Sequence, residues 1–122
     1  MNRELCKKEQ KWIDILLNIK FKGRDILLKQ ILNATVSCKR GYDFISIKFN
    51  VESKIEPYPY QVRVPIEMRA YQSSSAPILF LLHIIDGVVD ELEIITADST
   101  YLNVNNIELE KVEYEINREV LL

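Results

Sequence analysis

Apolar and polar residues recur along this chain with two different periods, first that of a helix and then that of a strand. In residues 3–20 the apolar positions are spaced by three and four, with lysines between them, which predicts an amphipathic helix capped by Asn2. A second apolar face predicts a shorter helix over residues 24–32, and Gly23 marks the break between the two. We therefore expect the chain to open with two helices.

Farther along, the apolar period becomes two, which is typical of strands with one buried face. The alternation is clearest in residues 44–51 and 61–71, and it is weaker in 35–37 and 107–116. Pro65 cannot donate a ladder hydrogen bond, so we expect an edge strand or a bulge there. The pattern predicts an α+β fold of two layers. Two N-terminal helices pack on one face of an antiparallel sheet of about five strands, arranged as a meander.

Residues 78–95 carry the strongest local signal, because Asp86-Gly87 between two β-rich runs favours a type I′ hairpin. With that turn Ile85 faces Val88, and a regular ladder fixes every other pair. The pairs on the expected core face are His83 with Asp90, Leu81 with Leu92 and Leu79 with Ile94. The pairs on the other face, which mixes large apolar groups with carboxylates, are Ile84 with Val89, Leu82 with Glu91 and Phe80 with Glu93.

The second sheet face has no obvious cover in this chain apart from the C-terminal strand or tail. We therefore expect Phe80 and Leu82 to lie partly exposed on that face, beside Glu91 and Glu93. Exposed apolar area rimmed by charge is a common mark of an interaction surface. These four residues are the partner-binding candidates that the sequence predicts.

Composition narrows the class of protein. A chain of 122 residues, 48% hydrophobic and 28% charged, fits a single globular domain over residues 1–122. The net charge of −2 gives no reason to expect nucleic-acid binding. The charge is uneven, however, with 12 Lys/Arg against 6 Asp/Glu in residues 1–54 and 4 against 12 in residues 55–122. Such asymmetry steers charged partners.

The two cysteines, Cys6 and Cys38, are expected to be reduced thiols of a cytoplasmic protein. The N-terminus has no apolar segment of the kind that follows the basic residues of a secretory signal. The longest apolar run, residues 76–85, is much shorter than the ~20 residues of a membrane helix. We expect no membrane partner.

His83 is the only histidine, so every catalytic or metal hypothesis depends on it. Its predicted cross-strand neighbour, Asp90, would complete half of a catalytic arrangement. The candidate nucleophiles are Ser73, Ser74, Ser75, Ser99 and Cys38, and no motif selects among them. A structural histidine is the favoured interpretation. One histidine and two distant cysteines do not have metal-site spacing, and the three glycines form no phosphate-binding motif, so we expect no cofactor.

Three segments resemble a family of small uncharacterised bacterial proteins that are similar to immunity proteins of toxin systems. The segments are residues 62–67, residues 81–87 with their Leu-His and Asp-Gly pairs, and Glu91-Leu92-Glu93-Ile94, ahead of an Asp98-Ser99 turn. The chain departs from that pattern at residues 40–43, where the family has a small Cys/Gly-rich turn. The resemblance covers residues 5–98 and implies tight binding to a cognate toxin without catalysis.

The leading hypothesis is a cytoplasmic, non-catalytic protein-binding module, an immunity- or antitoxin-like inhibitor. Its outer sheet face and acidic edge would occlude the basic active site of a toxin such as a nuclease. One alternative is a small enzyme that uses His83 and Asp90. Another is a homodimeric structural module in which the uncovered face pairs with its copy.

Overall fold

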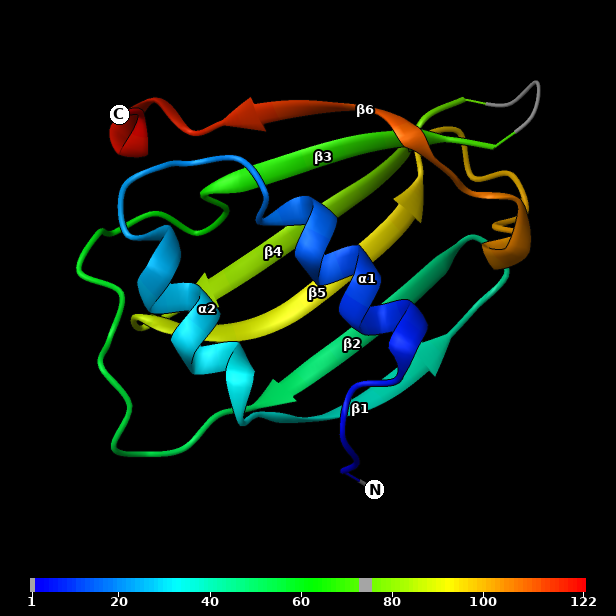
Figure 1. Cartoon of the computed structure of the whole chain (residues 1–122). Coiled ribbons are helices and arrows are strands. Elements are labelled where there is room, and N and C mark those ends of the chain that lie inside the picture. The colour runs from blue at the N-terminus through cyan, green and yellow to red at the C-terminus, as the bar shows by residue number, and fades with distance from the viewer. Residues whose placement is uncertain (1, 73–75) are drawn as a thin grey trace.

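Two helices lie over one face of an antiparallel sheet in the computed structural model, which describes residues 2–72 and 76–122 (Figure 1). The helices of this α+β fold are α1 (Lys7–Leu16) and α2 (Arg24–Leu32). The strands are β1 (Thr35–Arg40), β2 (Phe44–Asn50), β3 (Ile66–Tyr71), β4 (Ile78–Ile85), β5 (Val88–Thr96) and β6 (Glu108–Ile116). Short 3-10 turns cover Val104–Asn106 and Arg118–Val120.

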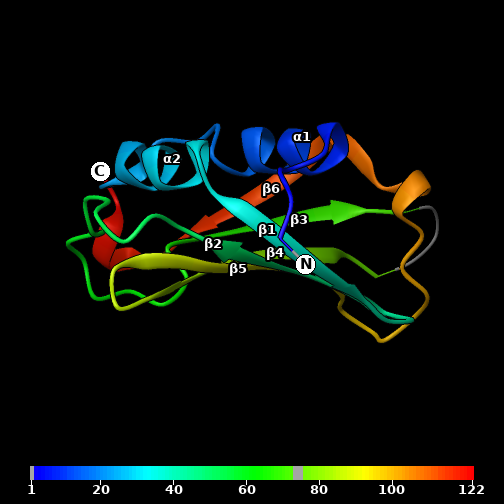
Figure 2. The same ribbon diagram turned by 90° about the horizontal axis from the view of Figure 1, so that it is seen from below.

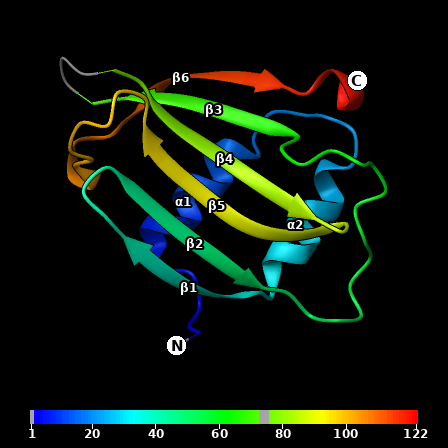
Figure 3. The ribbon, with the colours of Figure 1, turned by 180° about the vertical axis from the view of Figure 1, so that it is seen from behind.

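The described strands form one sheet of six strands, rather than about five, in the order β1-β2-β5-β4-β3-β6. Every neighbouring pair is antiparallel, but the expected meander order is wrong because β2 lies beside β5. Residues 51–65 carry the chain from β2 past the β4–β5 turn to β3 (Figure 3). Apolar pairs such as Ile47 with Leu92 join β2 to β5. As a result β1 and β6 are the two edges.

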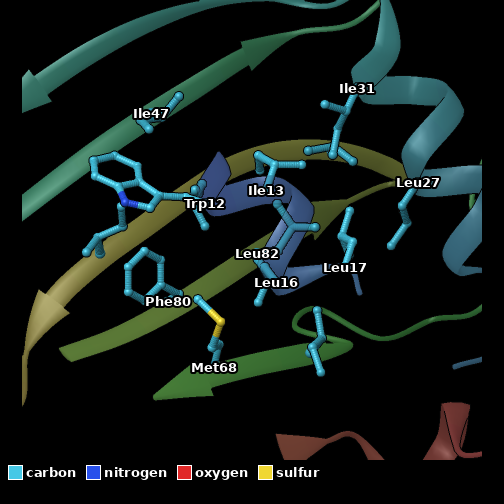
Figure 4. Packing of buried hydrophobic residues seen from close by; sticks show 14 of the residues in the cluster. Trp12, Ile13, Leu16, Leu17, Leu27, Ile31, Ile47, Met68, Phe80 and Leu82 are labelled. Carbon is cyan, nitrogen blue, oxygen red and sulfur yellow. The ribbon is translucent and has the colours of Figure 1, made fainter. Parts of the chain in front are cut away.

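The core lies between the helices and the sheet (Figure 2). From α1, Trp12, Ile13 and Leu16 are buried, and α2 contributes its own buried side chains. Trp12 meets the ring of Phe80 edge to face, with the ring centroids 6.1 Å apart (Figure 4). Aromatic pairs of this geometry add to the free energy of burial, so Phe80 lies at the centre of the packing.

Helix α1 is shorter than the predicted helix and is capped by Cys6 rather than Asn2. The Cys6 backbone N–H donates to Glu9 Oε1 at 2.9 Å, which satisfies one free amide of the first turn. The preceding residues are extended, because Arg3 and Val36 exchange two backbone hydrogen bonds, of 2.8 and 2.6 Å. The residues before α1 therefore pair with the edge strand β1 instead of extending the helix. The predicted bounds of α2 are confirmed.

Strand β3 begins at Ile66, directly after Pro65, so the expected strand over residues 61–71 is too long. It is an interior strand between β4 and β6, which contradicts the expectation of an edge or bulge at the proline. Proline without an N–H is accommodated here because the strand starts after it. The Pro65 carbonyl still forms a hydrogen bond of the β3–β6 ladder, because it accepts the Asn117 N–H at 3.0 Å.

The C-terminal tail packs against the helical layer and does not cover the opposite sheet face (Figure 2). Val120 is fully buried, and its carbonyl accepts the Lys22 N–H at 2.8 Å in the connection between the helices. Among the described residues, no segment lies over the face of the sheet opposite the helices (Figure 2). No helix in this part of the chain is long and apolar enough to cross a membrane.

Candidate functional site

The β4–β5 hairpin begins as predicted and then changes register. Asp86 and Gly87 have φ of 52° and 79°, as a type I′ turn requires, and Ile85 faces Val88. The register then shifts between His83 and Ile84, so that His83 faces Glu91. Asp90 is the extra residue of a β-bulge, and its predicted pairing with His83 is wrong.

The bulge reverses the predicted assignment of the β4 side chains, whereas Leu92, Ile94, Glu91 and Glu93 of β5 lie on the faces predicted for them. Phe80 and Leu82 pair with Ile94 and Leu92, and both are fully buried under the helices. Their expected exposure beside the two glutamates is therefore wrong, and they offer no surface to a partner. The physical reason is that the extra residue in β5 shifts its pairing with β4 by one position, and such a shift exchanges the side chains that share a face. The bulge thereby brings Phe80 and Leu82, rather than Leu79 and Leu81, onto the face of Leu92 and Ile94.

The sequence contains a signal for this bulge. A regular strand that buries Val89 would also bury positions 91 and 93, which are glutamates. The buried residues are instead Val89, Leu92 and Ile94, so one spacing of three interrupts the period of two. Mixed apolar and charged faces in a regular register are thus evidence for an inserted residue.

We call the sheet face opposite the helices the outer face. Half-buried apolar side chains form an apolar centre across β2, β5 and β4, and charged residues border it on the β3 side and toward the β4–β5 turn. Glu91 and Glu93 lie on this face, as predicted. The main residues of the outer face are Phe44, Ser46, Lys48, Glu67, Arg69, Leu79, Leu81, His83, Glu91, Glu93, Ile95, Glu113 and Glu115. The apolar members from β4 and β5 were assigned to the core or left out by the sequence prediction.

The bulge places Asp90 beside an outer-face cation. Lys48 Nζ lies 3.1 Å from Asp90 Oδ2 and 3.6 Å from Glu91 Oε1. The hydrogen bond to Asp90 raises the pKa of Lys48 above its ordinary value. The Ser46 hydroxyl donates to the second oxygen of Glu91. Glu91 is therefore held in one orientation on the outer face by strand β2.

His83 is held between a carboxylate and a guanidinium. Its Nε2 lies 2.9 Å from Glu93 Oε1, and its Nδ1 accepts a hydrogen bond from Arg63 Nε at 3.2 Å. Since a guanidinium only donates, Nδ1 carries no proton, and Nε2–H donates to Glu93. The imidazole is therefore oriented by two neighbours, neither of which is the predicted Asp90.

The candidate nucleophiles lie away from His83 where the structure describes them. Ser99 follows the far end of β5, and Cys38 is an exposed free thiol on the edge strand β1. Ser73, Ser74 and Ser75 lie outside the described residues. His83 thus has an orienting carboxylate, but neither described candidate stands beside it.

An acidic hollow adjoins the outer face where β3, β4 and β6 meet the C-terminal turn. It encloses about 830 Å³, and its lining includes Leu81 together with Glu67 and Glu115 from paired strands. Asn117, Arg118 and Glu119 complete the polar part of its lining. A hollow with more carboxylates than cations suits a basic side chain of a binding partner.

Comparisons of the chain with protein-family models, with curated proteins and with solved structures found no match. In the described part of the chain, no three His, Cys, Asp or Glu side chains are grouped so as to hold a metal ion. The outer face is therefore the feature of the molecule that suggests a function.

Proposed function

We propose that the protein is a non-catalytic, immunity- or antitoxin-like inhibitor that binds a basic protein partner through the outer face. The observation that supports this function is a half-buried apolar centre bordered by carboxylates, on a sheet face that no described segment covers. Uncovered apolar surface with a charged rim is typical of interaction sites.

The apolar centre supplies the anchors of the proposed interface. Leu79, Leu81 and Ile95 lie in neighbouring rows of β4 and β5, and each is half-buried before any partner binds. Complete burial of such central side chains provides much of the affinity of protein interfaces. Leu79 and Leu81 thus take the anchoring role that the sequence suggested for Phe80 and Leu82.

The charge of the outer face determines the kind of partner. The carboxylates of this face outnumber its cations by a small margin. They are Glu67, Asp90, Glu91, Glu93, Glu113 and Glu115, against Lys39, Lys48, Arg63 and Arg69. An acidic surface accelerates association with a basic partner. Enzymes that act on nucleic acids present basic clefts to their polyanionic substrates, so occlusion of a nuclease active site fits this surface.

Two alternatives have weaker support. A homodimer through the outer face would bring carboxylates of both copies together, and like charges in an interface oppose binding. An enzyme based on His83 would need a nucleophile or general acid close to the imidazole. Among described side chains, its recorded hydrogen bonds go to Glu93 and Arg63.

The test is capture of the partner with three forms of the tagged protein from its native lysate, read by quantitative mass spectrometry. The forms are the wild type, the double variant Glu91→Lys/Glu93→Lys, and the control Glu4→Lys/Glu52→Lys. The control makes the same change in charge at exposed sites in the segments that precede α1 and follow β2. We expect one basic protein to be retained by the wild type and control but lost by the outer-face variant. Equal capture by all three forms would contradict the proposed face.

A further inference from the structure

Strand β6 forms an open edge of the sheet (Figure 1). It pairs with β3 on one side, and no described segment pairs with it on the other. An edge strand presents unpaired backbone N–H and C=O groups, which are a template for another strand. The backbone groups and side chains that β6 directs outward determine which strand could pair with it.

The direction of the backbone groups follows from the ladder with β3. Asn117 N–H donates to the Pro65 carbonyl at 3.0 Å, so this pair occupies a hydrogen-bonding position. Hydrogen-bonding and non-hydrogen-bonding positions alternate in antiparallel ladders. Glu115 and Glu113 therefore direct their backbone groups to β3, whereas Tyr114 and Ile116 direct theirs away from the sheet.

The side chains of β6 alternate with the same period. Tyr114 and Ile116 are half-buried on the helical side, where Tyr114 Oη donates to the Ile15 carbonyl at 2.6 Å. Glu113 and Glu115 are exposed on the outer face. A strand added at this edge would thus extend an apolar layer on one side and meet carboxylates on the other. Its sequence should alternate apolar and basic residues.

The opposite edge is closed at one position. Arg3 occupies the outward N–H and C=O of Val36 on β1. Its guanidinium is fixed by two hydrogen bonds to Glu9, both of 2.7 Å. Among the described residues, β6 has no such closing segment.

A second copy of β6 is an unsuitable occupant. Antiparallel pairing of two β6 strands centred on Glu113 or on Tyr114 would place Glu113 across from itself or from Glu115, and like charges in cross-strand pairs destabilise a sheet. The charge of the edge therefore opposes self-pairing and favours a basic strand from a different protein.

We infer that the β6 edge binds an extended segment of a protein partner, in which basic and apolar residues alternate, as an added antiparallel strand. The inference rests on the proposed function in taking the partner to be a basic protein, and it names the element that this partner contributes.

The first test uses a capped decapeptide of alternating lysine and valine as the probe, titrated into the isotope-labelled full chain and followed by NMR. In the antiparallel arrangement, the valines lie opposite Tyr114 and Ile116 and direct their own N–H groups to β6. We expect the largest shifts, and slower amide exchange, at these two residues. Shifts centred on Glu91 and Glu93, or no shifts at millimolar peptide, would overturn the inference.

Two N-methylated forms of the same peptide test strand pairing without any change to the protein. Methylation of the valine amides removes the donors that face β6, and we expect affinity to fall by about tenfold or more. Methylation of the lysine amides alters the far side of the strand, and affinity should change by less than about threefold. Equal affinities of the two methylated peptides would show that binding does not involve a β ladder.

A matched pair of protein variants tests the same edge. Ile116→Pro removes an outward N–H, whereas Ile116→Ala removes a similar amount of side-chain packing and keeps the N–H. We expect only the proline variant to lose peptide binding, with thermal unfolding verifying that both variants fold. If the captured partner is lost with Glu91→Lys/Glu93→Lys but kept with Ile116→Pro, the proposed function stands and the strand addition is overturned.

Discussion

The β4–β5 hairpin has two faces with opposite chemistry, although both arise from the same two strands. On the core face, Phe80 and Leu82 meet Leu92 and Ile94, and all four are fully buried. On the outer face, half-buried leucines lie among His83 and two glutamates. One inserted residue in β5 produces this separation. The comparison shows that a single bulge can sort a strand of mixed sequence into a stabilising face and a polar one.

The largest difference in the free energy of unfolding should appear when a large apolar side chain on each face is truncated to alanine. Phe80→Ala removes the ring that packs against Trp12 and should lower the free energy of unfolding by about 3–5 kcal/mol. Leu79→Ala, one residue away on the outer face, should lower it by about 1 kcal/mol. Urea denaturation measures both values. Similar losses for the two variants would show that the faces do not differ as the structure indicates.

Replacement of the buried Gln30 should destabilise the fold nearly as much, because its side-chain amide hydrogen-bonds three backbone groups. Buried Gln30 of α2 donates to the carbonyls of Glu56 and Gly87 and accepts the Val89 N–H at 2.8 Å. Gln30→Leu leaves the buried Val89 N–H and the Glu56 carbonyl without this partner, while the Gly87 carbonyl keeps the Tyr58 N–H at 2.7 Å. The substitution should destabilise the fold by about 2–4 kcal/mol.

The control for this prediction is Gln10→Leu on the exposed side of α1, where the amide donates only to the exposed Asp14. We expect its free energy of unfolding to stay within about 0.5 kcal/mol of wild type. A Gln30→Leu variant as stable as this control would mean that the β4–β5 turn and the β2–β3 connection can rearrange without a loss of stability.

The buried carboxylate Glu9 should make stability depend on pH. The hydrogen bond from Arg3 lowers the pKa of Glu9 below its ordinary value of 4.5. The associated stability is present above pH 4.5 and is lost as the pH falls through the lowered pKa.

We expect this pH-dependent contribution to be about 1–2 kcal/mol in the wild type and to be reduced in Arg3→Met. Urea unfolding at a series of acidic pH values measures it. Parallel pH profiles for the wild type and Arg3→Met would exclude the ion pair as the cause.

The smallest effect should come from His83. Its imidazole bonds to Glu93 on the solvent side of the sheet, and such partly exposed polar pairs contribute little. His83→Gln should change the free energy of unfolding by less than about 1 kcal/mol, as measured by thermal unfolding. A larger loss would mean that the outer face contributes to stability through this histidine rather than remaining available for binding.

Local patterns in the sequence predict the parts of the fold that depend on local contacts. The bounds of α2, the alternation of β2 and the Asp86-Gly87 turn all follow from spacing and turn chemistry. The placement of Glu91 and Glu93 on the outer face was also predicted, although for a register that proved wrong.

The rest depends on contacts between distant residues. The length of α1 depends on the pairing of Arg3 with Val36, which the helical spacing of its apolar residues does not reveal. The sheet order depends on which strand pairs with β2. The apolar period of two does not reveal this, because it is the same in every candidate strand. The bulge was detectable from the spacing of Val89 and Leu92, but a regular hairpin is the simpler interpretation until the core is known.

The strand order also has a kinetic consequence. The β1–β2 and β4–β5 hairpins close over short connections, whereas the β2–β5 and β3–β6 ladders each join segments separated by two other strands. Closing such a long loop loses chain entropy before any pairing energy is gained. We therefore expect the two hairpins to form before the long-range ladders. The association of β2 with β5 and of β3 with β6, through pairs such as Ile47 with Leu92, should then limit how fast the chain reaches its native sheet.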